Sequence, residues 1–160
     1  MDDDTRALAE NKLIILYLIE KIEIPLSNSE ICQFALEKNL MDYFSVQQYL
    51  SELVESELLE MTTENNCMRY TITPNGEDTL NFFIKHISNY AKSVINTYAK
   101  ENSKRIRAEY AVTANYFQEM NNEYTVKCGV YDSDGTTSLM EISVNVATKD
   151  QARTICRNWK

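Results

Sequence analysis

The sequence predicts an α+β protein, because the period of its hydrophobic pattern changes once along the chain. Up to about residue 104, apolar residues recur at the three- and four-residue spacing of amphipathic helices, interrupted by one pair of short β-prone runs. From residue 105 to about residue 146 they alternate with a period of two, which is typical of strands. With 160 residues, 44% of them hydrophobic, the chain is long enough for one domain or two small ones.

Three helices are predicted in the first 60 residues. The run AENKLIILYLIEKI, residues 9–22, is apolar almost all round and predicts a deeply packed helix. Ser27 and Glu30 match a capping box that begins a second helix. Ser45 is the predicted N-cap of a third helix that ends at Glu57. Apolar residues at helical spacing form its inner side: Val46, Tyr49, Leu50, Leu53 and Val54.

A hairpin and a fourth helix are expected next. The runs LLEMTT (58–63) and CMRYTIT (67–73) are β-prone and are separated by turn residues. Thr73 then caps a helix with Pro74 at its first position, where the missing N–H of proline costs nothing. Three helices, a hairpin and a helix are the order of a winged helix-turn-helix domain. We place this domain at residues 1–75, with the hairpin at 58–73 as its wing.

Four segments resemble an uncharacterised winged-helix family from Gram-positive anaerobic bacteria. In this order and with these gaps, they are ENKLIILYLIEKI, PLSNSEI, YFSVQQYLSELVES and YTITPNGEDTL. The resemblance extends through the C-terminal part of the chain. It implies the winged-helix fold, through which that family is grouped with transcriptional regulators. Because one fold serves many functions, individual residues must carry the functional argument.

Residues 76–103 are predicted to continue as one long linking helix, a candidate dimerisation element. Its apolar residues fall alternately four and three residues apart, which is the spacing of a coiled-coil seam. The predicted interface residues are Leu80, Ile84, Ile87, Ala91, Val94 and Tyr98. This stripe is larger than a small winged domain needs for itself, which favours a homodimer. The alternative is that the chain's own C-terminal part covers it.

Residues 104–160 are predicted to form a small α+β domain. Alternating segments starting at Arg105, Glu123 and Ser138 predict a three-stranded antiparallel meander, and Thr148 is the expected cap of a closing helix. Four residues of the last strand are expected to point inward: Met140, Ile142, Val144 and Val146. Four tyrosines suit either the wall of a small effector pocket or, more simply, the core of the sheet: Tyr110, Tyr116, Tyr124 and Tyr131.

The sequence predicts no enzyme, no metal site and no cofactor. Its four cysteines are isolated and His86 is its only histidine. The segment from Asp132 to Gly135 imitates the start of a calcium loop, but glycine comes two positions early and Ser143 stands where a glutamate is needed. A type I′ Asp-Gly turn explains it. The longest apolar run, Leu13–Ile19, is too short to span a bilayer and the chain opens with acidic residues, so we expect a cytoplasmic protein that does not enter the membrane.

The third helix raises the main functional question, because it contains no lysine or arginine. Residues 1–75 hold fourteen acidic and five basic residues, which disfavours nonspecific binding to nucleic acid. The outward N-terminal positions of the third helix are nevertheless neutral hydrogen-bonding residues of the kind that contact base edges. The wing adds one cation, Arg69. The candidate DNA-binding residues are Ser45, Gln47, Gln48, Ser51, Asn65, Asn66 and Arg69.

Two functions of different classes remain open from the sequence. In the first, a homodimer places its third helices in successive major grooves of double-stranded DNA and regulates transcription. In the second, the winged domain is a protein–protein interaction module whose acidic surface binds a basic protein partner and not DNA. A continuous positive stripe on the third helices would favour the first function, whereas an acidic face would favour the second.

Overall fold

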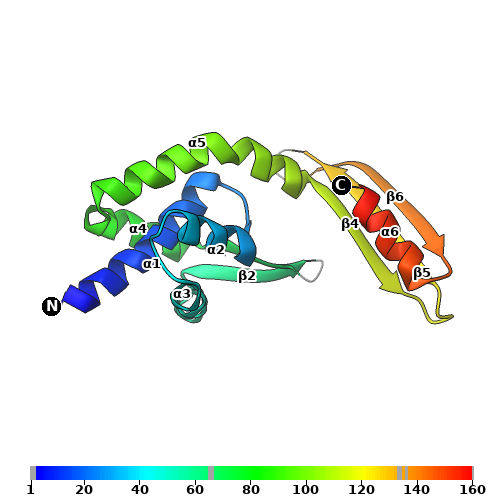
Figure 1. Ribbon diagram of the computed structural model, residues 1–160, viewed down its shortest axis with the longest axis horizontal. Coiled ribbons are helices and arrows are strands. Elements are labelled where there is room, and N and C mark those ends of the chain that lie inside the picture. Colours follow the sequence, from blue (N-terminus) through cyan, green and yellow to red (C-terminus); the bar gives the residue numbers. More distant parts are fainter. Residues whose placement is uncertain (1–2, 65–66, 133–134, 136, 160) are drawn as a thin grey trace. The chain divides into compact units, whose positions relative to one another are not determined.

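The computed structural model describes residues 3–64, 67–132, 135 and 137–159. Within these residues the chain is an α+β protein with six α-helices, one 3₁₀ turn and two three-stranded antiparallel sheets (Figure 1). It divides into two compact units, Met1–Glu101 and Asn102–Lys160, and each contains one of the sheets. The predicted α+β class is confirmed at this level.

Helix α1, Asp3–Ile22, is the central helix of the first unit. Every residue from Leu13 to Ile19 is at most 6% exposed, so the middle of this helix is surrounded by other parts of the unit. The deeply packed helix predicted from the apolar run is therefore confirmed. Each fully buried leucine or isoleucine contributes about 1.5–3 kcal/mol, which makes this segment a main source of the unit's stability.

The short strand β1, Leu26–Ser27, leads directly into helix α2, Asn28–Glu37. The predicted capping box at the start of α2 is present. The backbone N–H of Glu30 donates to the Ser27 hydroxyl at 3.1 Å, and the N–H of Ser27 donates to the Glu30 carboxylate at 2.8 Å. Two orphan donors at the start of α2 are thereby satisfied.

Helix α3 spans Tyr43–Glu55, so the predicted N-cap, Ser45, is wrong by three residues and the predicted end, Glu57, by two. Asp42 and not Ser45 is its N-cap, and the Asp42 carboxylate accepts the backbone N–H of Ser45 at 3.0 Å. Aspartate and serine are both good N-cap residues. The helix begins at the first of the two that the chain reaches.

Strands β2, Leu59–Glu64, and β3, Cys67–Ile72, pair antiparallel with Leu59 opposite Ile72. The two β-prone runs thus pair as predicted. Strand β1 lies on the other side of β3, which gives the order β1-β3-β2. The predicted turn residues Asn65 and Asn66 lie outside the described residues.

Helix α4, Pro74–Phe83, begins as the sequence predicts. The hydroxyl of Thr73 accepts the backbone N–H of Gly76 at 3.0 Å, and Pro74 occupies the first turn. Gly76 lies against the backbone carbonyl of Leu58, and a Cβ at this position would overlap that oxygen. Glycine therefore allows α4 to approach the segment that leads into β2.

The predicted single helix over residues 76–103 is wrong. Helix α4 ends at Phe83, a 3₁₀ turn (η1) covers Ile84–His86, and helix α5, Asn89–Ala111, starts after an extended residue at Ile87. The Ser88 hydroxyl accepts the N–H of Ala91 at 3.3 Å, in the manner of an N-cap. A regular apolar spacing cannot distinguish one long helix from two helices that each bury the same side.

The second unit contains strands β4, Val112–Gln118, β5, Tyr124–Tyr131, and β6, Ser138–Val146, followed by helix α6, Lys149–Trp159. The strand order β4-β5-β6 is antiparallel throughout, which confirms the predicted meander. Thr148 accepts the N–H of Gln151 at 3.2 Å and so caps the closing helix as expected. Helix α6 lies on one face of the sheet (Figure 1), and its Ala152 packs against the core of that face.

The expected start of the first strand at Arg105 is wrong, because α5 continues to Ala111. Ile106 is fully buried, but on a helix. Ile106 and Tyr110 are four residues apart, and this separation fits a period of two as well as a period of 3.6. The alternating pattern therefore misassigned the last two turns of the helix as strand.

The four residues of β6 expected to face inward do lie on the sheet face that carries α6, but only Val146 packs against the core. Met140, Ile142 and Val144 are 46%, 39% and 36% exposed. A helix is about 10 Å across and strands lie about 4.8 Å apart, so one helix covers about two strands of three.

Candidate interaction surface on helix α3

Helix α3 buries one side and exposes the other. Four of the five residues predicted on its inner side, all but the half-buried Val54, are buried against the rest of the unit. The exposed residues, together with the cap residue, form what we call the α3 surface: Asp42, Tyr43, Phe44, Gln48, Ser51 and Glu55.

Two aromatic side chains dominate the N-terminal end of the α3 surface. Phe44 is 82% exposed and Tyr43 is 50% exposed, and their rings meet edge to face with 5.7 Å between centroids. Exposed aromatic pairs of this kind are typical of protein-binding surfaces, since they can bury a large area at low entropic cost. The sequence analysis overlooked both residues because it began the helix at Ser45.

The charged residues of the α3 surface itself, Asp42 and Glu55, are acidic, and beside them Glu52 is paired with Lys12. Hydrogen bonds from the hydroxyl and then the backbone N–H of Ser45 lower the pKa of Asp42. The pKa of Glu52 is also lowered, first by the hydrogen bond from Lys12 and then by the amide of Gln48 at 2.9 Å. Both carboxylates are therefore charged at neutral pH. From residue 42 to residue 60 the chain has five acidic residues and no lysine or arginine.

An open depression of about 420 Å³ adjoins the α3 surface beside Asp42. Leu36, which is 49% exposed, lies on its rim, and Asp42 contributes a carboxylate. Three elements of the first unit line it, through Asn11, Leu36, Asn39, Leu40, Met41, Asp42 and Ser45. An exposed leucine beside a carboxylate suits the aliphatic stem and charged head of a lysine or arginine side chain.

The structure does not bring the candidate DNA-binding residues together on one exposed surface. Gln48 and Ser51 are exposed on α3. Gln47 is half-buried and its amide exchanges hydrogen bonds with the amide of Asn28, at 2.9 and 2.8 Å. The Ser45 hydroxyl donates to Asp42 at 2.7 Å. Gln47 and Ser45 therefore serve the packing of the domain, a role that helical spacing alone did not reveal.

The structure also gives Arg69, predicted to contact DNA from the hairpin, a contact within the protein. Arg69 is half-buried on β3, and its guanidinium donates to the backbone carbonyl of Pro25 at 3.4 Å. This bond directs the side chain toward the segment before β1. Asn65 and Asn66 lie outside the described residues, so the structure assigns them no position.

The residues predicted to form a dimer seam contribute mainly to the core of the first unit. Leu80, Ile87, Ala91 and Tyr98 are at most 8% exposed, and the remaining two, Ile84 and Val94, are half-buried. Contacts within the first unit contribute to this burial, such as that of Tyr98 with Phe34. These four side chains are thus not available to a second copy, while dimerisation itself stays a prediction.

The helices that bury this seam are identified by two contacts. The Tyr98 ring packs edge to face on Phe34 of α2 with 4.7 Å between centroids. The hydroxyl of Tyr17 on α1 donates to the Asn96 side chain of α5 at 3.0 Å. The first part of α5 is therefore an integral part of the core around α1 and α2.

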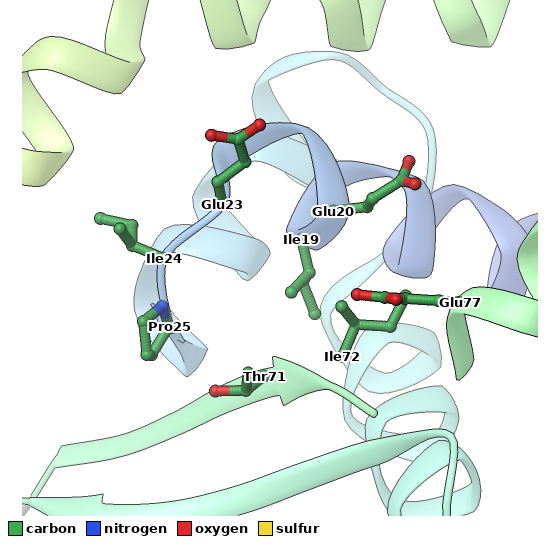
Figure 2. Close-up of a pocket in the computed structure, with 8 residues that line it drawn as sticks. All are labelled: Ile19, Glu20, Glu23, Ile24, Pro25, Thr71, Ile72 and Glu77. Carbon is green, nitrogen blue, oxygen red and sulfur yellow. The ribbon is translucent and has the colours of Figure 1, made fainter. Parts of the chain in front are cut away.

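A second depression, of about 340 Å³, lies between the end of α1 and β3 (Figure 2). Ile19 and Ile72 point toward each other across it, while Glu20, Glu23 and Glu77 supply carboxylates. Within the described part of the chain, no group of three or more His, Cys, Asp or Glu side chains is placed to hold a metal ion. The three glutamates are consequently separate acidic groups around an apolar floor.

The surroundings of the cysteine, histidine and tyrosine side chains favour structural roles for them. All four cysteines are thiols, and burial raises the pKa of the Cys32 and Cys128 thiols, which disfavours the nucleophilic thiolate. His86 is exposed on η1, with its ring 5.8 Å from that of Phe83. Tyr116 and Tyr124 pack against the core of the second sheet, which favours the sheet-core interpretation for these two tyrosines.

None of the helices in the described residues is both long and apolar enough to cross a membrane.

Comparison with known proteins identifies the family of this chain. Neither the curated proteins nor the solved structures contain a significant match. A family model does match residues 11–160, which is nearly the whole chain. That family is described as a domain of unknown function, and this agrees with the resemblance to an uncharacterised family. The chain therefore belongs to the family Domain of unknown function (DUF4364).

Proposed function

We propose that the protein is a winged-helix protein-interaction module whose α3 surface binds a basic protein partner. The proposal is supported by the order of the elements from α1 to α4, which is the order expected of a winged helix-turn-helix domain; in this interpretation α3 is the recognition helix and β2-β3 the wing. DNA-binding members of this fold anchor phosphates with lysine and arginine around that helix. Here the corresponding segment, residues 42–60, has none of these residues.

The observation that carries the proposal is the exposure of Phe44 between charged carboxylates. A phenylalanine that is 82% exposed at the start of α3 costs free energy in water, and burying it against a partner contributes about 1.5–3 kcal/mol. Asp42 and Glu55 on the same surface would face a phosphate backbone with like charge. The same carboxylates attract lysine or arginine.

The depression beside Asp42 indicates how a partner residue would bind. A lysine or arginine stem can lie against the exposed Leu36 while its charged head reaches the Asp42 carboxylate. An arginine beside it can also stack on the exposed ring of Tyr43 or Phe44. The preferred partner segment therefore contains arginine or lysine next to an apolar residue.

A DNA-binding transcriptional regulator is the second candidate function. It is favoured by one observation: Gln48 and Ser51 are exposed on α3 at positions from which a recognition helix reaches base edges. In this case the protein would be a homodimer on double-stranded DNA with weak phosphate anchoring. Its affinity would be low, and rising salt would reduce it further.

One experiment distinguishes the two functions. Purified protein is tested for binding to an array of peptides with varied arginine, lysine and aromatic content, and to labelled genomic fragments from around its own gene, at several salt concentrations. We expect retention of arginine- or lysine-containing peptides and no retention of DNA at physiological salt. Salt-sensitive retention of DNA without peptide binding would overturn the proposal in favour of the regulator.

A matched pair of variants tests the surface itself. Phe44→Ser removes the exposed ring of α3, whereas Phe82→Ser removes a ring of α4 that is 79% exposed. We expect the first variant to lose peptide binding by about tenfold or more, as for an aromatic residue at the centre of an interface, and the second to bind like wild type. Equal effects of the two substitutions would show that peptide binding does not use the α3 surface.

A further inference from the structure

The edge strand β6 presents apolar side chains that its own helix leaves uncovered. Met140, Ile142 and Val144 lie on the face of the second sheet that carries α6, because Ile142 and Val144 pair with the core residues Cys128 and Val126 of β5. These three side chains are nevertheless exposed, at 46%, 39% and 36%. An apolar strip of this kind on a regular strand is typical of an interaction surface.

The backbone of β6 is open on the same edge. Among the described residues, β6 is paired with β5 alone over its nine residues, Ser138–Val146. Edge strands usually discourage further pairing by lysine, by proline or by short length. The strand contains neither lysine nor proline, and its single charged residue is Glu141. The pairing of β6 with β5 is irregular only at the start of β6, where Met140 pairs with Val130 and Ser138 pairs with Tyr131.

We propose that β6 pairs antiparallel with β6 of a second copy of this chain, about a twofold axis at Ile142. Ile142 is the central residue of the strand, so this register pairs Met140 to Val144, in the regular part of β6, with the same residues of the second copy. On the apolar face, Ile142 lies opposite Ile142 of the second copy, and Met140 lies opposite Val144. On the other face, Glu141 lies opposite the neutral Ser143.

The neighbouring registers are less favourable for defined reasons. An axis at Glu141 would place two glutamates opposite each other, which destabilises an antiparallel pair. An axis at Ser143 would leave Ser138 and Leu139 without partners. A register that pairs Ile142 with Ser143 would turn the apolar faces of the two strands to opposite sides of the joined sheet, because side chains alternate along a strand. Self-complementarity about Ile142 thus selects a second copy as the occupant of this edge.

Charge substitutions on the polar face test both the dimer and its register. In Ser143→Glu, the new glutamate lies opposite Lys127 of its own chain, so the two charges attract in the monomer. In the dimer it also lies opposite Glu141 of the second copy, which repels it. We expect the dimer dissociation constant to rise by about tenfold, since two symmetry-related like-charge pairs act together. Adding Glu141→Lys turns both pairs into attractive ones, so the double variant should return to the wild-type constant or a lower one.

A matched control uses the same strand, face and charge change. Asn145→Glu places its carboxylate opposite Leu139 of the second copy, so we expect its dissociation constant to stay within about twofold of wild type, as for a surface substitution with no charge directly opposite. Ile142→Lys, at a residue already 39% exposed in one chain, places two lysines opposite each other and should raise the constant strongly. This variant supplies a second test if Ser143→Glu does not fold.

The measurement is sedimentation equilibrium of the full chain from low to high micromolar concentration, with circular dichroism to confirm that each variant is folded. The proposal requires a wild-type dimer, a weaker Ser143→Glu dimer and recovery in the double variant. A wild-type protein that stays monomeric at the highest concentration overturns it. A dimer that Ser143→Glu and Asn145→Glu weaken equally, or that Ile142→Lys leaves unchanged, also overturns it.

Discussion

The side-chain amides of Gln47 and Asn28 hydrogen-bond to each other in both directions, at 2.9 and 2.8 Å, and so join the start of α2 to the first turns of α3. The Gln47 amide also donates to the sulfur of Cys32 at 3.1 Å. The residue at this position of α3 therefore fixes the geometry of two helices.

Replacing Gln47 with alanine should destabilise the fold. Asn28 loses its amide partner in a half-buried position, which costs roughly 1–3 kcal/mol of unfolding free energy. Urea denaturation measures the loss. Gln48→Ala, which changes the exposed neighbour, is the control and should stay within about 0.5 kcal/mol of wild type. If Gln48→Ala costs as much as Gln47→Ala, the bonds to Asn28 do not stabilise the pair of helices.

The N-cap of α3 should make stability depend on pH. Folding lowers the pKa of Asp42, so its carboxylate stabilises the folded state above the ordinary aspartate pKa, and this contribution is lost as pH falls through the folded-state pKa. Asp42→Asn keeps a capping side chain without the charge. Thermal unfolding should show a higher Tm for wild type at neutral pH and a smaller difference below about pH 3. A difference that is constant across this range would contradict the charge argument.

Ile87→Glu should unfold the first unit. Ile87 is 2% exposed, and an unpaired carboxylate there costs on the order of 3–5 kcal/mol, a large part of the stability of a domain. Circular dichroism and urea denaturation should show loss of the cooperative transition at every protein concentration. A folded, monomeric Ile87→Glu protein would instead show that this side chain lies between subunits.

Gly76→Ala should be destabilising although alanine favours helices. In an unobstructed helix the change would stabilise by about 0.5–1 kcal/mol. Here the added Cβ overlaps the Leu58 carbonyl, and the expected cost is about 1–3 kcal/mol. Asn75→Ala, at the exposed neighbour, is the control for helix propensity. A stabilised Gly76→Ala protein would mean that α4 can shift away from Leu58 without loss.

The sequence was sufficient to predict features that depend on local spacing. The buried run Leu13–Ile19, the capping box of Ser27 and Glu30, and the inner side of α3 all follow from residues a few positions apart. The β2-β3 hairpin and the β4-β5-β6 meander also follow, because these strands are joined by short connections, whereas the pairing of β1 with β3 spans two helices and was not predicted. The α+β class is the sum of these local signals.

Features that depend on distant partners could not be predicted in this way. Helical spacing alone puts Gln47 on the outward side of α3. Its partner Asn28 lies nineteen residues earlier in the chain, so only the folded structure shows their contact. The alternating apolar side chains of β6 predict core residues. Three of them are exposed because α6 is too narrow to cover all three strands. The break at Ser88 depends on capping chemistry and on the bond that its N–H donates to Glu10 at 2.8 Å, seventy-eight positions away.

That bond to Glu10 has a consequence for how the protein can be divided into fragments. It holds the chain at the point where α4 gives way to α5, and the residues that follow fill the space beside α1 and α2. A fragment that stops near residue 75 would lack Leu80, Ile87 and Ile95, all of them buried. The smallest autonomous folding fragment of the first unit therefore extends to about residue 101, and binding studies on an isolated N-terminal domain need that longer piece.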